Sequence, residues 1–105
     1  MAWLYLFSAG ILEIVWAFTM KQSDGFTRPM PTVITIVTMI GSFALLSLAM
    51  RSLPLGTAYT IWTGIGAVGA FVIGVTVLGE ALTPMRIAAA TLIVSGLVMM
   101  KLSAS

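Results

Sequence analysis

A single carboxylate in the middle of a long apolar segment constrains the fold of this chain more than any other feature. Residues 2–20 read AWLYLFSAGILEIVWAFTM, and Glu13 is the only acidic or basic side chain among them. A helix of this length spans roughly 28 Å at ~1.5 Å per residue, which matches the hydrocarbon core of a bilayer. Inserting a carboxylate near the membrane centre costs at least ~2.5 kcal/mol, so such residues mark functional sites by default. We therefore expect Glu13 to be the centre of a functional site.

The composition of the whole chain also favours an integral membrane protein. Hydrophobic residues make up 60% of the chain and charged residues only 8%, whereas soluble domains carry about 25% charged residues. The chain has no cysteine and no histidine, which excludes disulfides, thiolate chemistry, soft-metal sites and imidazole proton relays. The five basic residues form no stripe that would bind nucleic acid. We expect no enzymatic activity, no cofactor and no metal.

Three breaks rich in charge and proline divide the chain into four apolar stretches. The fourth stretch is the shortest, but Arg86 and Lys101 can extend it by placing their charges at the membrane surface. We expect an all-α fold in which residues 1–105 form a single transmembrane domain. Its four helices are predicted over residues 2–20, 32–50, 55–79 and 85–102.

The basic residues are divided almost evenly between the two sides of this arrangement. Arg51 and Lys101 lie on one side, and Lys21, Arg28 and Arg86 lie on the other. Because the distribution of lysine and arginine sets the orientation of a membrane protein, the near balance leaves two alternatives. The chain either has one weakly preferred topology, or inserts in both orientations and pairs as an antiparallel homodimer. Four short helices enclose little of a pathway, which favours an oligomer.

Small residues and a tryptophan share the helix face of Glu13. Residues three and four apart on a helix point the same way, which places Gly10, Trp16 and Ala17 beside the carboxylate. The small residues leave room either for a ligand or for a neighbouring helix to approach closely. The alternative role for Glu13 itself is a structural hydrogen bond to a neighbouring helix. In an antiparallel dimer Glu13 would meet its symmetry mate, and the two would titrate as a coupled pair. A proton would then compete with a cationic substrate.

The third stretch combines aromatic residues with glycines. Tyr59 and Trp62 lie on one helix face, where their rings would attract a cation and their O–H and N–H groups could donate to a carboxylate. Both residue types are also common anchors at the membrane surface. The mid-span pair Gly64 and Gly66 is a candidate conformational hinge, and close helix packing is a compatible alternative.

Candidate residues also occur in the second and fourth stretches. Ser42 lies at about the depth of Glu13, where it either touches the site or bonds the carbonyl four residues before it. Ala89 and Gly96 lie seven residues apart on one face of the fourth stretch, and small residues at this spacing predict a dimer contact. Glu80 lies at a helix end, where a solvated loop charge is expected.

Together these residues resemble the small multidrug resistance transporters. The similarity comprises Glu13 with Gly10 and Trp16, followed by Tyr59-x-x-Trp62 and Gly64-x-Gly66, and covers essentially the whole chain. The resemblance implies an antiparallel, dual-topology homodimer in a bacterial inner (plasma) membrane that exchanges protons for cations at Glu13. It also implies site-lining or supporting roles for Trp16, Tyr59 and Trp62, a bend at Gly64-Ile65-Gly66, and a dimer seam along Ala89 and Gly96.

Within that family the chain is more similar to the guanidinium exporters than to the quaternary-ammonium branch. Residues 21–28, Ser42, the run 56–66 and Lys101 carry this similarity. Guanidinium is a planar cation with donors around its edge, and carboxylates bind it in bidentate fashion. We therefore predict a proton-coupled antiporter that exports guanidinium, with small substituted guanidinyl cations as further candidates.

Three other functions compete with this prediction. A multidrug exporter of lipophilic quaternary ammonium ions needs a more open aromatic pocket, for which Phe7, Phe43 and the methionine-rich interior are candidates. A passive channel is the second alternative, although a single buried acid without a polar-lined pore argues against it. The third is a membrane partner that does not transport, such as half of a heterodimer.

Overall fold

The computed structural model describes residues 1–103 as four helices joined by short loops. All four are long and apolar enough to cross a membrane, which confirms the all-α, four-helix membrane fold. The last two positions of the expected domain, 104–105, lie outside the described residues. The helices are α1 (Ala2–Gln22), α2 (Pro29–Ala49), α3 (Leu55–Thr76) and α4 (Pro84–Ser103).

The helix ends differ by a few residues from the predicted ones, for local reasons. Helix α2 begins at Pro29 because proline fits the first turn of a helix. Backbone N–H groups in the first turn make no hydrogen bond within the helix, so the missing N–H of proline costs nothing there. Helix α1 continues past Met20, and Lys21 in its last turn interacts favourably with the helix dipole. Helix α3 ends at Thr76, before Gly79, whose φ of 69° belongs to a turn and not to a helix.

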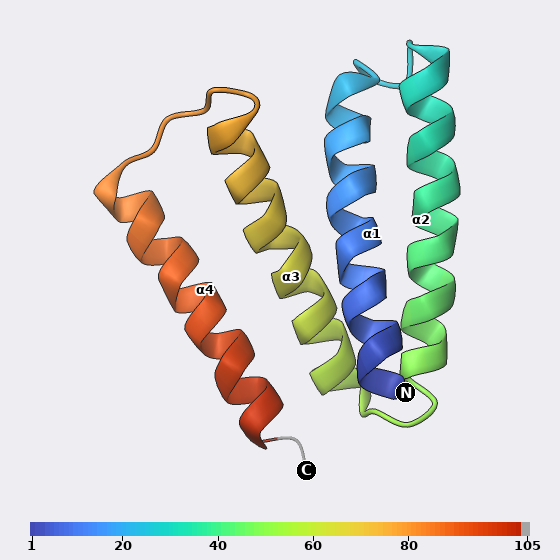
Figure 1. Cartoon of the computed structure of the whole chain (residues 1–105), viewed down its shortest axis with the longest axis vertical. Helices are drawn as coiled ribbons and strands as arrows, with labels where there is room; N and C mark the ends of the chain where they lie inside the picture. Colours follow the sequence, from blue (N-terminus) through green and yellow to red (C-terminus); the bar gives the residue numbers. More distant parts are fainter. Residues whose placement is uncertain (104–105) are drawn as a thin grey trace.

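The four helices lie side by side in a single layer. The principal extents are 42 × 35 × 16 Å, and a helix with its side chains is ~10–12 Å across, so the shortest dimension holds one helix. The order across the layer is α4, α3, α1, α2 (Figure 1), and α1 contacts both α2 and α3.

Glycines allow neighbouring helices to approach closely. A Cβ added to Gly10 of α1 would lie 2.7 Å from Cγ2 of Ile65 in α3, and one added to Gly69 of α3 would overlap Ile14 of α1. Gly64 makes the equivalent contact with Leu97 of α4. Small residues at such crossings increase helix contact in a membrane, where burial against lipid gives little driving force.

The buried core is concentrated at the end of the layer that carries the N-terminus. It combines the first half of α1, the last part of α2 and the first part of α3, through Leu6, Ala9, Leu46, Ala49, Ala58, Ile61 and Trp62. At the same end the ammonium group of Lys101 lies 4.7 Å from the centroid of the Trp3 ring, a cation–π contact that links α4 with α1. The packing is therefore denser at this end than at the end formed by the 77–83 loop.

A pair of buried hydroxyl groups joins α1 and α2 near the other end of these helices. The Oγ1 atoms of Thr19 and Thr35 are 2.7 Å apart. Each hydroxyl is also within hydrogen-bond distance of a carbonyl in its own helix, at Val15 and Pro31 respectively. The pair adds a hydrogen bond between the two helices to the bonds that each hydroxyl makes within its own helix.

We expect Thr35→Val to lower the free energy of unfolding by about 0.6–1.5 kcal/mol, because Thr19 loses its partner on α2 while the side-chain shape is kept. The measurement is reversible unfolding of the purified protein in mixed detergent. Thr91→Val in α4 is the matched control, since that hydroxyl is exposed and bonds the carbonyl of Ile87 at 2.8 Å. Equal losses in the two variants would contradict the role of the buried pair.

Candidate functional site

The carboxylate of Glu13 lies directly against the backbone of α3. A Cβ added to Gly66 would overlap Cδ and Oε1 of Glu13, so glycine at position 66 is a condition for this placement. Glu13 as a whole is half-buried. Its Oε1 atom is buried and finds no hydrogen-bond partner among residues 1–103. Because a buried charged acceptor is costly to leave without a donor, the geometry suits a ligand that brings its own donors.

Ser42 connects three helices close to this carboxylate. Its hydroxyl donates to the carbonyl of Ala9 at 2.7 Å and accepts from Nε1 of Trp62 at 3.0 Å. Ala9 lies four residues before Glu13, and Trp62 lies four residues before Gly66. Along each helix the network therefore lies about one turn from Glu13 or Gly66.

These hydrogen bonds show which of the roles expected for Ser42 and Trp62 the structure has. Ser42 bonds neighbouring helices, so the alternative of a bond to the carbonyl four residues before it is wrong. The indole N–H of Trp62 donates to Ser42, so the idea that it donates to the carboxylate is wrong as well. Trp62 and Ser42 are both buried, which makes them a rigid support one turn from Glu13.

Four aromatic rings form a continuous chain across α1, α2 and α3. The centroid distances are 6.3 Å from Trp16 to Phe43, 5.8 Å from Phe43 to Trp62 and 5.6 Å from Trp62 to Tyr59. The ring pairs are tilted or edge-on, as aromatic contacts prefer. Nε1 of Trp16 is buried and has no acceptor within residues 1–103. It is a second polar atom near Glu13 in sequence that remains available to a ligand.

The glycines of the candidate site separate into two groups. Gly66 receives the Glu13 carboxylate, and Gly10 packs against Ile65 one turn away. Gly64 faces Leu97 of α4 instead. Helix α3 runs without interruption through Gly64-Ile65-Gly66, so these glycines serve close packing in this conformation. Their role as a hinge stays a prediction.

The two residues expected at the dimer contact lie on uncovered surface. Ala89 and Gly96 are exposed, and a Cβ added to Gly96 would meet no atom within 4 Å. None of the residues of α4 is buried. A second copy therefore has access to this face, and the dimer contact stays a prediction.

Two participants were not among the residues proposed for the site from the sequence. Phe43 bridges Trp16 and Trp62, whereas the sequence suggested it only as part of an alternative pocket for bulky cations. Its position beside Ser42 gave no clear signal, because consecutive residues on a helix point ~100° apart. The Ala9 carbonyl accepts the hydrogen bond of Ser42. A backbone acceptor of this kind cannot be recognised from the residue type.

The arrangement suits reversible binding of a cation. Within residues 1–103 no group of three or more acidic, histidine or cysteine side chains gathers to hold a metal ion. The site consists of one carboxylate, aromatic rings, and a hydrogen-bonded support one turn away. A carboxylate exchanges a proton or a cation without covalent chemistry, and the rings add attraction for positive charge.

Comparison with known proteins gives a consistent result over almost the whole chain. The family model described as Small Multidrug Resistance protein matches residues 1–93. The chain is 55% identical over 103 residues to proteins named guanidinium exporter in Escherichia coli (strain K12) and Shigella flexneri, covering 98% of each chain. A protein of the same name in Citrobacter freundii is 54% identical over the same length and coverage.

We expect Ser42→Ala to lower the free energy of unfolding by about 1–3 kcal/mol, because the buried indole N–H of Trp62 loses its acceptor and the Ala9 carbonyl loses its donor from α2. The measurement is unfolding in mixed detergent, followed by tryptophan fluorescence. Ser47→Ala is the matched control, since Ser47 is exposed on the same helix. If Ser42→Ala proves as stable as the control, the network does not support the site.

Proposed function

Because the chain belongs to the small multidrug resistance family, we propose that it exports guanidinium from the cell in exchange for protons. It is a multi-pass protein of the bacterial inner membrane, and its family consists of transporters. The observation that carries the proposal is the Glu13 carboxylate, which lies against Gly66 inside a membrane-spanning helix with a buried oxygen free of hydrogen bonds within residues 1–103. Small substituted guanidinyl cations are further candidate substrates.

The choice of guanidinium follows from the donors and acceptors around Glu13. Guanidinium carries N–H donors in a fixed plane, and a carboxylate accepts two of them in parallel. Trp62 donates its N–H to Ser42, which leaves the carboxylate oxygens free for donors of the substrate. The ring of Trp16 lies on the same helix face as Glu13 and adds cation–π attraction. The names of the close relatives support this choice.

Exchange requires that Glu13 hold either a proton or a cation and never both. Burial disfavours a bare carboxylate, so the empty site takes up one of the two. Alternating exposure to the two sides of the membrane then couples a proton moving one way to a cation moving the other. In this mechanism the glycines Gly64 and Gly66 permit the bend of α3 between the two states.

An antiparallel homodimer completes this mechanism. Glu13 is only half-buried within one copy, and a second copy would cover its exposed part and bring a second Glu13 near the first. The near balance of basic residues on the two sides supports insertion in both orientations. Ala89 and Gly96, which are exposed on α4, provide the contact between the copies.

Export of lipophilic quaternary ammonium ions is the second candidate. The aromatic chain supports it, because Tyr59 is 52% exposed and Phe43 is 48% exposed. Exposed rings offer attraction to a cation that has no N–H donors. Such a substrate would leave the carboxylate oxygens without hydrogen bonds, which is why guanidinium is preferred.

Purified protein in liposomes tests the proposal directly. An outward guanidinium gradient should drive proton uptake in a fixed ratio, whereas tetraphenylphosphonium should drive little. Robust exchange of tetraphenylphosphonium without guanidinium would establish the second candidate. Guanidinium flux with no associated proton movement would indicate a channel, and no flux of either cation would indicate a membrane partner that does not transport.

We expect Glu13→Gln to abolish guanidinium–proton exchange in this assay, because the amide neither binds a proton nor carries the charge that attracts the cation. Asp24→Asn is the matched control, since it also removes a carboxylate but Asp24 is exposed in the loop between α1 and α2. Its exchange rate should equal that of the wild type. Exchange retained in Glu13→Gln would refute the shared site.

We expect Gly66→Ala to weaken guanidinium binding about tenfold, which corresponds to the loss of one charge-assisted hydrogen bond. The added methyl group would overlap the carboxylate of Glu13 and force it to another position. Gly56→Ala is the control, because a Cβ at that helical position meets no atom within 4 Å. Calorimetric titration measures both variants, and equal affinities would show that the contact with Gly66 does not position Glu13.

A further inference from the structure

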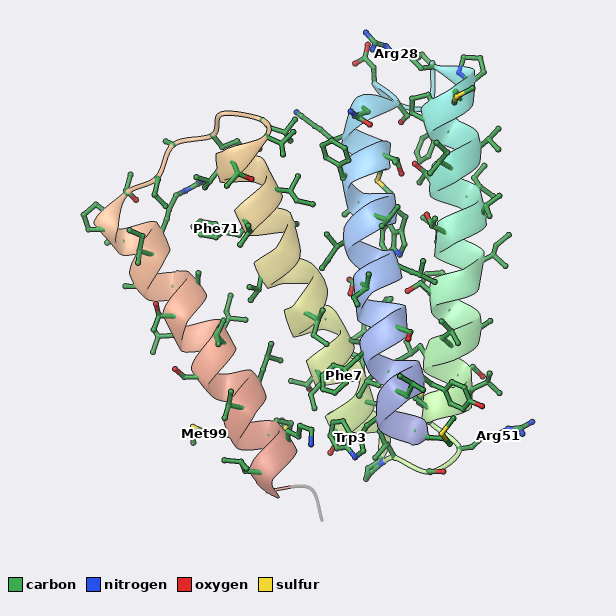
Figure 2. All side chains as sticks on the ribbon, viewed as in Figure 1. Trp3, Phe7, Arg28, Arg51, Phe71 and Met99 are labelled. Carbon is green, nitrogen blue, oxygen red and sulfur yellow. The ribbon has the colours of Figure 1, made fainter. Side chains whose placement is uncertain are left out.

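A cavity lies between α1, α3 and α4, and Glu13 is not among the residues that line it. Its volume is about 490 Å³, within the range of about 300–1,000 Å³ that is typical of ligand pockets. Helices α3 and α4 diverge toward the 77–83 loop (Figure 1), and Phe71 projects into the space between them (Figure 2). At the other end Leu97 packs closely on Gly64, so the cavity opens toward the loop end.

The walls and the mouth of this cavity differ in chemistry. The walls are apolar and include Phe18 of α1, Phe71 of α3 and Ile93 of α4. Charged residues line the same cavity where these helices reach the membrane surface: Lys21 lies in the last turn of α1, and Arg86 in the first turn of α4. The cavity therefore combines an apolar interior with a basic mouth.

The loop between α3 and α4 fixes the third charge at the mouth. The backbone N–H of Glu80 donates to the carbonyl of Gly74 at 2.9 Å, and a Cβ on Gly74 would overlap the Glu80 carboxylate. Glu80 is exposed, as expected of a loop charge. The guanidinium of Arg86 donates to the carbonyl of Ala81 at 3.2 Å. With two cations and one carboxylate, the mouth has a net positive charge.

We propose that this cavity binds an anionic phospholipid, with the phosphate between Lys21 and Arg86 and an acyl chain along the apolar walls. Basic pockets between transmembrane helices at the membrane surface bind anionic headgroups. A free phosphate ion would neutralise the basic residues at the mouth but leave the apolar interior of the cavity unfilled. A lipid satisfies both parts at once, and the surrounding bilayer supplies it.

Ala89, a residue of the proposed contact between copies, also lines the cavity, but charge argues against a second copy filling the mouth. The loop face that carries Lys21 and Arg86 is basic, and the opposite face carries Arg51 and Lys101. A second copy would therefore bring further positive charge toward the mouth in either orientation. The lipid site does not depend on the proposed transport function.

The test measures retention of phosphatidylglycerol by the purified full-length protein in detergent, by native mass spectrometry, with phosphatidylcholine as the neutral lipid. We expect Lys21→Gln and Arg86→Gln each to lower phosphatidylglycerol affinity about fivefold, and the double variant about 25-fold, from the attraction typical of one basic residue at a membrane surface. Arg51→Gln, which removes the same charge on the opposite face, should leave the affinity unchanged.

A steric variant tests the apolar part of the site. Ala70 is exposed and lines the cavity, so Ala70→Phe should displace the acyl chain and reduce phosphatidylglycerol retention even with both cations present. Inorganic phosphate is the second probe. Phosphate binding that depends on Lys21 and Arg86, together with undiminished lipid retention in Ala70→Phe, would overturn the lipid assignment in favour of a free anion.

Two further outcomes would overturn the proposal. Equal losses in Arg51→Gln and the two mouth variants would show that only overall charge matters. A change from dimer to monomer in the mouth variants, with lipid affinity unchanged, would make the cavity an interface between copies. Lipid retention is measured without guanidinium or a proton gradient, so a failed transport assay has no bearing on this result.

Discussion

The contact between the Glu13 carboxylate and the bare backbone at Gly66 is the constraint on which the rest of the structure depends. A carboxylate held between two membrane helices needs a neighbour without a side chain, and the glycine on α3 provides it. The same crossing requires Gly10 opposite Ile65 and Gly69 opposite Ile14. The close approach of α1 and α3 thus places the acid, while the aromatic chain and the Ser42 network occupy the side toward α2.

Much of the fold and the centre of the candidate site could be predicted from the sequence, because both depend on local properties. The lengths of the apolar stretches predict four spans, and one acid in the first span identifies Glu13. The partner of Ser42 could not be predicted, since a hydroxyl bonds its own helix or a neighbour according to how the helices cross. The start of α2 was also missed, because a proline ends one helix as readily as it begins another.

The separation of Gly64 from Gly66 shows how a sequence motif can combine two different structural tasks. Residues two apart on a helix point ~200° from each other. Gly64 accordingly packs on Leu97 of α4, and Gly66 faces Glu13 of α1. From their spacing in the sequence alone, Gly64 and Gly66 could have formed a single hinge. The structure assigns the two glycines to opposite sides of α3, so a displacement of α3 that changes one contact necessarily changes the other.

The chain begins at the same end of the layer at which α4 finishes (Figure 1). A reporter fused ahead of α1 and one fused after α4 would therefore occupy the same compartment in any given copy. In a population inserted in both directions, half of the fusions would be cytoplasmic and half periplasmic, whichever terminus carried them. Topology mapping with a compartment-sensitive enzyme or fluorophore would return an intermediate signal from both termini, which is a genuine property of such a protein and not incomplete insertion.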